Sequence, residues 1–150
     1  MTQFDQWMMR AIAEAKLTHD SADVPVAALV FDEHDALVAV GRNERELTGD
    51  PTAHAEVVAI RAAAAAVGRW RLDTMTLVVT LEPCTMCAGA ILQARIPRVI
   101  FGAWDEKAGA AGSVYDLLRD RRLPHKVEVV AGIQEAECAA LLTDFFEARR

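Results

Sequence analysis

Short apolar strands alternate with helical segments along the chain, and this alternation constrains the fold more than any other feature of the sequence. Apolar stretches predict strands at 24–31, 37–41, 74–80, 98–103 and 127–131. Periodicity and composition predict helices at 3–18, 54–67, 84–94, 114–119 and 135–149. Helices that connect successive strands imply a partly parallel sheet that is covered on both faces. The predicted fold class is therefore α/β, a three-layer α/β/α sandwich around a five-stranded mixed sheet.

Turn signals divide these segments. The polar run at 32–35 joins the first two strands into a hairpin, which supplies an antiparallel part of the sheet. Gly68 is a suitable C-terminal cap for the helix at 54–67. Repeats and low-complexity linkers are absent from the sequence. Residues 1–150 are therefore predicted to form a single domain with one core.

The composition argues against a membrane or secreted protein. The chain is 53% hydrophobic and 25% charged, which is an ordinary globular balance. Its apolar stretches are too short to span a bilayer. The first residues lack the basic start and apolar block of a secretory signal. We expect a cytoplasmic protein with no membrane partner.

The charge of the chain is acidic overall but uneven. The formal net charge is −6, which counts mildly against binding nucleic acid because phosphates attract basic surfaces. The C-terminal half nevertheless contains a cluster of basic residues. Its members are Arg119, Arg121, Arg122, His125 and Lys126, and Arg149 and Arg150 end the chain.

Three potential metal ligands occur in two short motifs. His54 opens one predicted helix, and Cys84 and Cys87 open another helix 30 residues further on. One imidazole and two thiolates leave one position of a tetrahedral zinc site open for water, which is typical of catalytic zinc. Cysteines three apart in a helix can reach one ion, and a helix N-terminus favours the thiolate. We therefore predict a catalytic Zn²⁺.

Glu56 is the predicted proton carrier of this site. It lies two residues after His54, in the first turn of the same helix, where its carboxylate can stand beside the open position without binding the metal. Zinc lowers the pKa of a bound water to roughly 7, so that the water can attack a ring carbon that carries an amino group. An H-x-E motif followed by P-C-x-x-C is the signature of zinc nucleobase deaminases.

Simpler interpretations exist for each motif alone. The Cys-x-x-Cys pair is also compatible with a redox pair, although His54 and Glu56 would then be unexplained. A closed structural zinc site needs a fourth ligand, and the remaining cysteine, Cys138, is predicted to belong to the core. The remaining aromatic and histidine side chains carry weaker signals. Trp7 and Trp70 are expected to pack, Trp104 is expected either to pack or to stack on a base, and His19, His34 and His125 are expected to be solvated.

Five segments resemble the bacterial tRNA adenosine deaminases, which convert the wobble adenosine of an arginine tRNA with an ACG anticodon to inosine. Residues 50–56 read DPTAHAE and residues 80–90 read TLEPCTMCAGA. The other three segments are VPV at 24–26, the stretch from Phe101 through GAAGS at 109–113, and CAALLTDFF at 138–146. The zinc motifs are typical of the whole deaminase superfamily. The last two segments resemble this family in particular.

The resemblance implies a cytidine deaminase-like fold, one zinc per subunit, a homodimer and a tRNA anticodon loop as partner. Activity would be that of a zinc-dependent hydrolase that deaminates adenosine with a zinc-activated water. It also implies substrate-binding roles for Asn43, Asp105, Phe145 and Phe146. The candidates for contacts with the RNA backbone are Arg119, Arg121, Arg122, Lys126, Arg149 and Arg150.

Two other functions stay open at this point. A deaminase of a free nucleobase or nucleoside, such as guanine or cytosine, is compatible with the acidic net charge. A non-catalytic RNA-binding protein could keep the same fold, but the intact ligand set and Glu56 argue against it.

Overall fold

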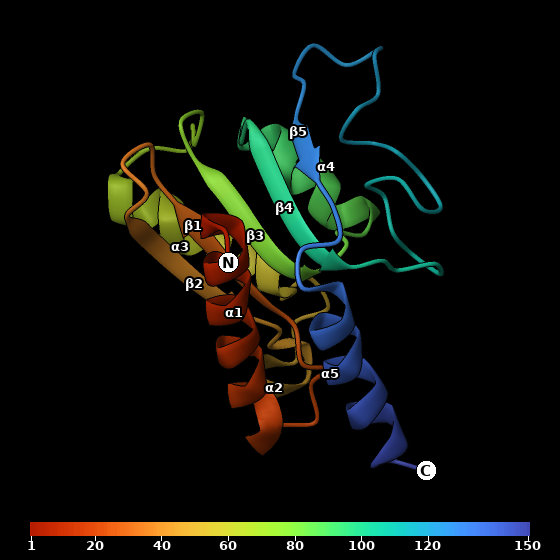
Figure 1. The fold of residues 1–150 in the computed structure, drawn as a ribbon. Coiled ribbons are helices and arrows are strands. Elements are labelled where there is room, and N and C mark those ends of the chain that lie inside the picture. The colour runs from red at the N-terminus through yellow and green to blue at the C-terminus, as the bar shows by residue number, and fades with distance from the viewer.

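A five-stranded sheet runs through the centre of the molecule (Figure 1). The computed structural model describes the backbone of residues 1–150 and every side chain except those of His19 and Asp20. Within this part of the chain the strands lie in the order β2-β1-β3-β4-β5. Their bounds are Ala27–Phe31 (β1), Leu37–Arg42 (β2), Thr76–Leu81 (β3), Arg98–Ala103 (β4) and Glu128–Val130 (β5). Strand β1 is antiparallel to β2 and β3, whereas β3, β4 and β5 are parallel, so the sheet is mixed as predicted.

Helices cover both faces of the sheet. Helices α1 (Gln3–Ala15) and α5 (Glu135–Glu147) lie on one face, and α3 (Ala55–Val67) and α4 (Thr85–Gln93) lie on the other (Figure 1). A short helix, α2 (Arg45–Thr48), and a 3₁₀ turn, η1 (Lys16–Asp20), complete the elements of the described chain. The three-layer α/β/α prediction is confirmed.

Alternating side chains of the central strands supply two separate cores. Leu77 and Val79 of β3 point toward α3 and α4, whereas Val78 between them points toward α1 and α5. Val99 and Phe101 of β4 alternate with Ile100 in the same way. Because both faces are buried, the central strands are continuous apolar runs, without the alternation of a half-exposed strand.

Helix α3 packs unusually close to the sheet because both surfaces carry small residues. Ala55, Ala59 and Ala63 form its buried face, and Gly41 of β2 lies against its backbone. A Cβ at Gly41 would lie 2.3 Å from the Ala55 carbonyl oxygen and 2.5 Å from the Ala59 nitrogen. This contact sets how far the start of α3, and therefore His54, stands from the strands.

Several predicted elements differ from those observed. The helix predicted at 114–119 is wrong: the chain forms turns there, with Gly112 N–H donating to Tyr115 O and Leu117 N–H to Ala110 O. Leu118 is still completely buried in this irregular segment. Helix α2 lies between the strand predicted at 37–41 and the helix predicted at 54–67, where no helix was predicted. The first helix ends at Ala15, so residues 16–18 of the predicted span belong to the 3₁₀ turn η1.

Single-residue predictions have mixed outcomes. Trp7 is buried as expected, but Trp70 is 59% exposed, so the prediction that it packs is wrong. His34 is solvated, whereas His125 is half-buried with its Nε2 2.9 Å from the Ile96 carbonyl oxygen. The side chain of His19 lies outside the described residues. None of the described helices has the length and apolarity that crossing a membrane requires.

The close approach at Gly41 leads to a stability prediction. Gly41→Ala should destabilise the fold by about 1–3 kcal/mol, because a methyl group there forces α3 away from β2. Urea unfolding followed by circular dichroism measures this change. Gly89→Ala in α4 is the matched control, since a Cβ there meets nothing within 4 Å and helix propensity favours alanine. Equal stabilities of the two variants would contradict the prediction.

Candidate active site and metal centre

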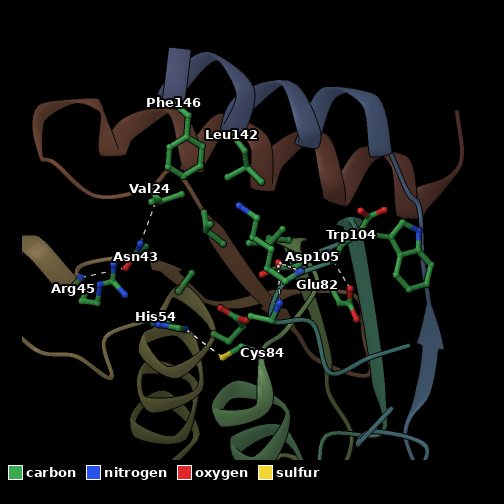
Figure 2. Close-up of a pocket in the computed structure, with 17 residues that line it drawn as sticks. Val24, Asn43, Arg45, His54, Glu82, Cys84, Trp104, Asp105, Leu142 and Phe146 are labelled. Atoms are coloured by element: carbon green, nitrogen blue, oxygen red, sulfur yellow. Dashed lines mark hydrogen bonds between the residues drawn. The ribbon is translucent and has the colours of Figure 1, made fainter. Parts of the chain in front are cut away.

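Two helix N-termini meet at the carboxyl ends of the parallel strands. His54 is the N-cap residue of α3, and Cys84 is the N-cap residue of α4. Strand β3 ends at Leu81, and the chain passes through Glu82 and Pro83 directly into α4. The motif residues, which are 30 positions apart in sequence, therefore face each other (Figure 2).

The three potential ligands have the spacing that a tetrahedral ion requires. The Nδ1 atom of His54 lies 3.6 Å from Cys84 Sγ and 3.5 Å from Cys87 Sγ. All three donor atoms lie within 4.8 Å of one another. Nitrogen and sulfur ligands at zinc bond lengths of about 2.0 and 2.3 Å would stand roughly 3.6 Å apart in a tetrahedron. The side chains are thus arranged to hold a metal without rearrangement.

Protonation of the two cysteines also suits metal binding. A hydrogen bond from Cys87 lowers the pKa of Cys84 to about 4, against the opposing effect of burial. The same bond, together with burial, raises the pKa of Cys87 above its usual range. The hydrogen bond with Cys84 raises the pKa of His54, while burial acts in the opposite direction. Zinc binds cysteines as thiolates, so a metal would replace the proton that the raised pKa keeps on Cys87.

Glu56 lies in the first turn of α3 and is 5% exposed. Burial raises the pKa of its carboxyl to about 7, although its backbone hydrogen bond and His54 lower it. A carboxyl with a pKa near neutrality can both accept and donate protons, as general acid–base catalysis requires.

A pocket of about 550 Å³ opens above these groups. Asn43 and Arg45 lie on one side of His54, and Asp105 and Trp104 lie on the other (Figure 2). Leu142 and Phe146 project over the pocket from α5. Of the four predicted substrate-binding residues, Asn43, Asp105 and Phe146 line the pocket. Phe145 does not: its ring packs edge-on against Phe146 and lies 3.6 Å from the Arg149 guanidinium.

Hydrogen bonds hold the polar pocket residues in place. Asn43 donates from Nδ2 to the Val24 carbonyl at 3.1 Å, and its Oδ1 accepts from Arg45 N–H. The Oδ1 atom of Asp105 accepts from the N–H groups of Lys107 and Ala108. Trp104 is 39% exposed at the rim, and its indole stands edge-on to Phe101 at 4.9 Å. It packs on one side and leaves part of its ring open to the solvent.

Sequence reasoning missed four polar residues of this region. Arg45 and Lys107 are cations in the pocket lining, and no short motif distinguishes them from other surface cations. Glu82 and Asp23 are both 2% exposed, and each accepts hydrogen bonds from backbone N–H groups. Asp23 accepts from Glu46 and Leu47 and so fixes α2 beside Asn43. An acidic residue next to an apolar strand is the signal that could have identified both carboxylates.

The basic cluster does not lie at the pocket. Glu128 pairs with Arg98, the first residue of β4, whereas the pocket follows the last residue of that strand. The segment that leads into β5 lies at the end of the sheet away from α5 (Figure 1), and it contains Arg121, Arg122 and Lys126. Arg122 also pairs with Asp120 at 2.7 Å, and Arg119 pairs with Asp116 at 3.0 Å. Arg149 and Arg150 follow α5, one turn beyond Phe146.

Comparisons with known proteins identify the family. The family model described as MafB19-like deaminase matches residues 2–150. A tRNA-specific adenosine deaminase of Bacillus subtilis (strain 168) is 43% identical over 150 residues, which span 100% of this chain and 92% of that protein. The chain belongs to the tRNA-specific adenosine deaminase family.

Solved structures agree with this assignment. A structure from a study of A-to-I editing by tRNA:A34 deaminases at the wobble position has a TM-score of 0.86 and 38% identity, and the match covers 91% of this chain and 99% of that one. A guanine deaminase from Bacillus subtilis has a TM-score of 0.65 and 36% identity, covering 75% of this chain and 71% of that one. The tRNA-specific adenosine deaminase fold, which is cytidine deaminase-like, is thus shared with enzymes of free purine bases. The chain is accordingly a hydrolytic deaminase with a His-Cys-Cys group able to bind a metal.

The geometry of this deaminase site predicts how the metal is bound. Replacing one ligand, as in His54→Ala, should lower zinc affinity by at least roughly 100-fold, because two remaining ligands cannot complete the site. Metal analysis after equilibration with zinc and gel filtration measures the stoichiometry. Cys138→Ala is the control, since Cys138 is buried beside Gly102 and lies outside the ligand group. Zinc lost equally from both variants would contradict the assignment.

Proposed function

We propose that this protein deaminates adenosine to inosine at the wobble position of a tRNA, namely an arginine tRNA with an ACG anticodon, with one Zn²⁺ per subunit. The observation that carries the proposal is the placement of Glu56 beside a three-ligand group at the floor of a pocket, in a chain of the tRNA-specific adenosine deaminase family. The 150 residues would act as one deaminase domain in the cytoplasm, where tRNA is available.

Zinc would be held by His54 Nδ1, Cys84 Sγ and Cys87 Sγ, and it supplies Lewis acidity that lowers the pKa of water to about 7. The Glu56 carboxylate takes a proton from the attacking water and delivers it to N1 of the adenine ring. It then carries the second proton to the departing amino group. Adenosine and water become inosine and ammonia, and Glu56 returns to its starting state.

The pocket walls would hold the base that has been flipped out of the anticodon loop. Asn43 offers an amide that is already fixed by the Val24 carbonyl and by Arg45 N–H, so little entropy is lost when substrate binds. Phe146 and Leu142 cover the base with apolar surface, and Asp105 stands at the opposite wall. Phe145 would support Phe146 through their edge-on contact.

Cations around the pocket mouth would contact the phosphates on either side of the target nucleotide. Arg45 and Lys107 line the pocket, and Arg149 and Arg150 lie at the end of α5. These four charges oppose the net charge of −6 at the place where the RNA arrives. More distant parts of the tRNA would contact Arg121, Arg122 and Lys126. Arg119, whose guanidinium lies near Gly112 and Trp104, would contact RNA closer to the pocket rim.

A homodimer is supported by an apolar surface on the outer side of α3 and α4. Val57, Ile60 and Ala64 of α3 lie there with Ala90 of α4, and Trp70 is 59% exposed beside them. Large aromatic and aliphatic side chains at an exposed helix face are typical of subunit interfaces. We propose that a second copy of the chain covers this surface.

A second candidate function is the deamination of a free purine base. Its support is the shared fold and 36% identity with the guanine deaminase from Bacillus subtilis. The longer and closer match to tRNA-specific adenosine deaminases favours the tRNA substrate.

The deciding experiment incubates the zinc-loaded protein with an unmodified arginine tRNA bearing an ACG anticodon. The tRNA is then digested and inosine at the wobble position is quantified, while free adenosine, cytidine and guanine are tested in parallel for ammonia release. Inosine in the tRNA is the expected result. Ammonia from a free base together with an unchanged tRNA would overturn the tRNA proposal and favour the second candidate.

Glu56→Gln should retain zinc and fold but lose at least about 10²–10⁴-fold in turnover, because the amide cannot carry protons. Single-turnover deamination of the tRNA measures the rate, and metal analysis shows whether the site is intact. Glu137→Gln in α5 is a suitable control, because it makes the same chemical change at an exposed position. Turnover by Glu56→Gln at the native rate would rule out the proton-transfer role.

Charge reversal tests the proposed phosphate contacts. Lys107→Glu with Arg149→Glu should weaken tRNA binding and reduce the slope of log affinity against log salt by about 2, one for each lost contact. Arg121→Glu with Arg122→Glu changes the net charge equally at the other end of the sheet and should weaken binding less. Binding that falls equally in both variants would indicate that overall charge, and not position, controls affinity.

A further inference from the structure

A buried carboxylate joins the metal-ligand segment to one wall of the pocket. Glu82 follows strand β3 and lies two residues before Cys84, and it is only 2% exposed. Its Oε1 atom accepts a hydrogen bond from Asp105 N–H at 2.9 Å. Its Oε2 atom accepts from Ala111 N–H at 2.9 Å and from Ser113 N–H at 3.1 Å. Backbone N–H groups therefore solvate the carboxylate in place of water.

The loop between β4 and β5 is wrapped tightly around this carboxylate. Gly109 lies so close that a Cβ there would stand 2.2 Å from Glu82 Oε1. The Ser113 hydroxyl donates to the Asp105 carbonyl at 2.8 Å, which closes the loop into a ring. Ala110 N–H donates to the Pro83 carbonyl at 2.7 Å, and Gly109 pairs with Cys84 in an isolated bridge. Positions 105–113 are thus held by the same segment that supplies two of the metal ligands.

The part of the loop fixed in this way is a pocket wall. Residues 104–108 all line the pocket, on the side opposite Asn43 and Arg45 (Figure 2). The bond from Asp105 N–H to Glu82 determines where this wall begins relative to Cys84. Glu82 also lines the pocket, but its two carboxylate oxygens accept hydrogen bonds from N–H groups of the loop. It can therefore control the width of the space that a base would enter.

We propose that Glu82 is a positioning residue for substrate binding, which sets the distance between the wall at 104–108 and the metal centre. This inference rests on the proposed function, because it takes the tRNA to be the substrate. Glu82 then affects how tightly the protein binds the tRNA, whereas Glu56 moves the protons.

Glu82→Gln is the most direct test because it keeps the size of the side chain. The one carbonyl oxygen of the glutamine can accept hydrogen bonds from the N–H groups of Ala111 and Ser113. Its amide nitrogen then faces Asp105 N–H and cannot accept a hydrogen bond from it. We expect KM for the tRNA to rise by roughly 10-fold, the effect of losing one charge-assisted hydrogen bond, with kcat within about threefold of the native value. Hydrogen exchange at 104–113 should accelerate while α3 and α4 keep their protection and zinc stays bound.

Gly109→Ala disturbs the same contact between Glu82 and the loop, but by a change in the loop. The φ angle of Gly109 is not among the positive values of the described residues, so alanine fits the backbone. The new methyl group would stand 2.2 Å from Glu82 Oε1 and 2.3 Å from Ser113 Oγ, so it displaces both side chains that hold the loop. It should reproduce the rise in KM and the faster exchange. Asp5→Asn is the matched control, since Asp5 accepts hydrogen bonds from Thr2 and Gln134 at the start of α1, away from the pocket.

Three results would overturn the proposal. Exchange at 104–113 unchanged in Glu82→Gln would show that the carboxylate does not hold the wall. A fall in kcat with unchanged KM would place Glu82 in the chemical step. Loss of zinc from Glu82→Gln would show that Glu82 supports the metal ligands and not the pocket wall. If the native protein leaves tRNA unedited, the proposed function fails, and the exchange and metal measurements still decide whether Glu82 positions the wall.

Discussion

The close packing of α3 on the sheet is the constraint on which the rest of the site depends. Alanines on the helix and Gly41 on β2 allow two backbones to approach within the distance that a single methyl group would occupy. His54 begins this helix, so its position relative to the cysteines of α4 follows from the packing distance. Three donor atoms then fall within 4.8 Å of one another. Packing of small residues beside His54 thereby brings the potential metal ligands together.

Buried acidic groups organise the two sides of the pocket above this centre. Asp23 holds α2 beside Asn43, and Glu82 holds the loop that begins at Asp105. In both cases backbone N–H groups satisfy the carboxylate, which lets a charge be buried and makes the loop rigid. The pocket walls are therefore ordered without a substrate, which lowers the entropy cost that substrate binding would carry.

The distribution of charge reconciles an acidic chain with an RNA substrate. The pocket lining contains the buried Glu56 and Glu82 and the exposed Glu106, together with the cations Arg45 and Lys107. Arg149 adds a cation after the helix that covers the pocket. Local cations matter more than net charge, because screening limits the reach of each charge to roughly 8 Å at physiological salt. The basic residues at the other end of β4 are Arg121, Arg122 and Lys126, and Asp120 partly neutralises Arg122. Arg119 instead lies near Gly112 and pairs with Asp116.

The sequence by itself determined the α/β class, the strands and most helices, since these follow from local apolar runs and caps such as Gly68. It also indicated His54, Cys84, Cys87 and Glu56, because metal chemistry requires those residue types at short, recognisable spacings. Only the tertiary structure decided which residues surround them. Arg45 and Lys107 come from segments outside the two motifs, and Glu82, two residues before Cys84, binds a loop residue 23 positions further on. The segment at 114–119 forms turns because backbone hydrogen bonds tie it to residues 109–112. Such contacts depend on long-range packing, which leaves no periodic or local signal in the chain.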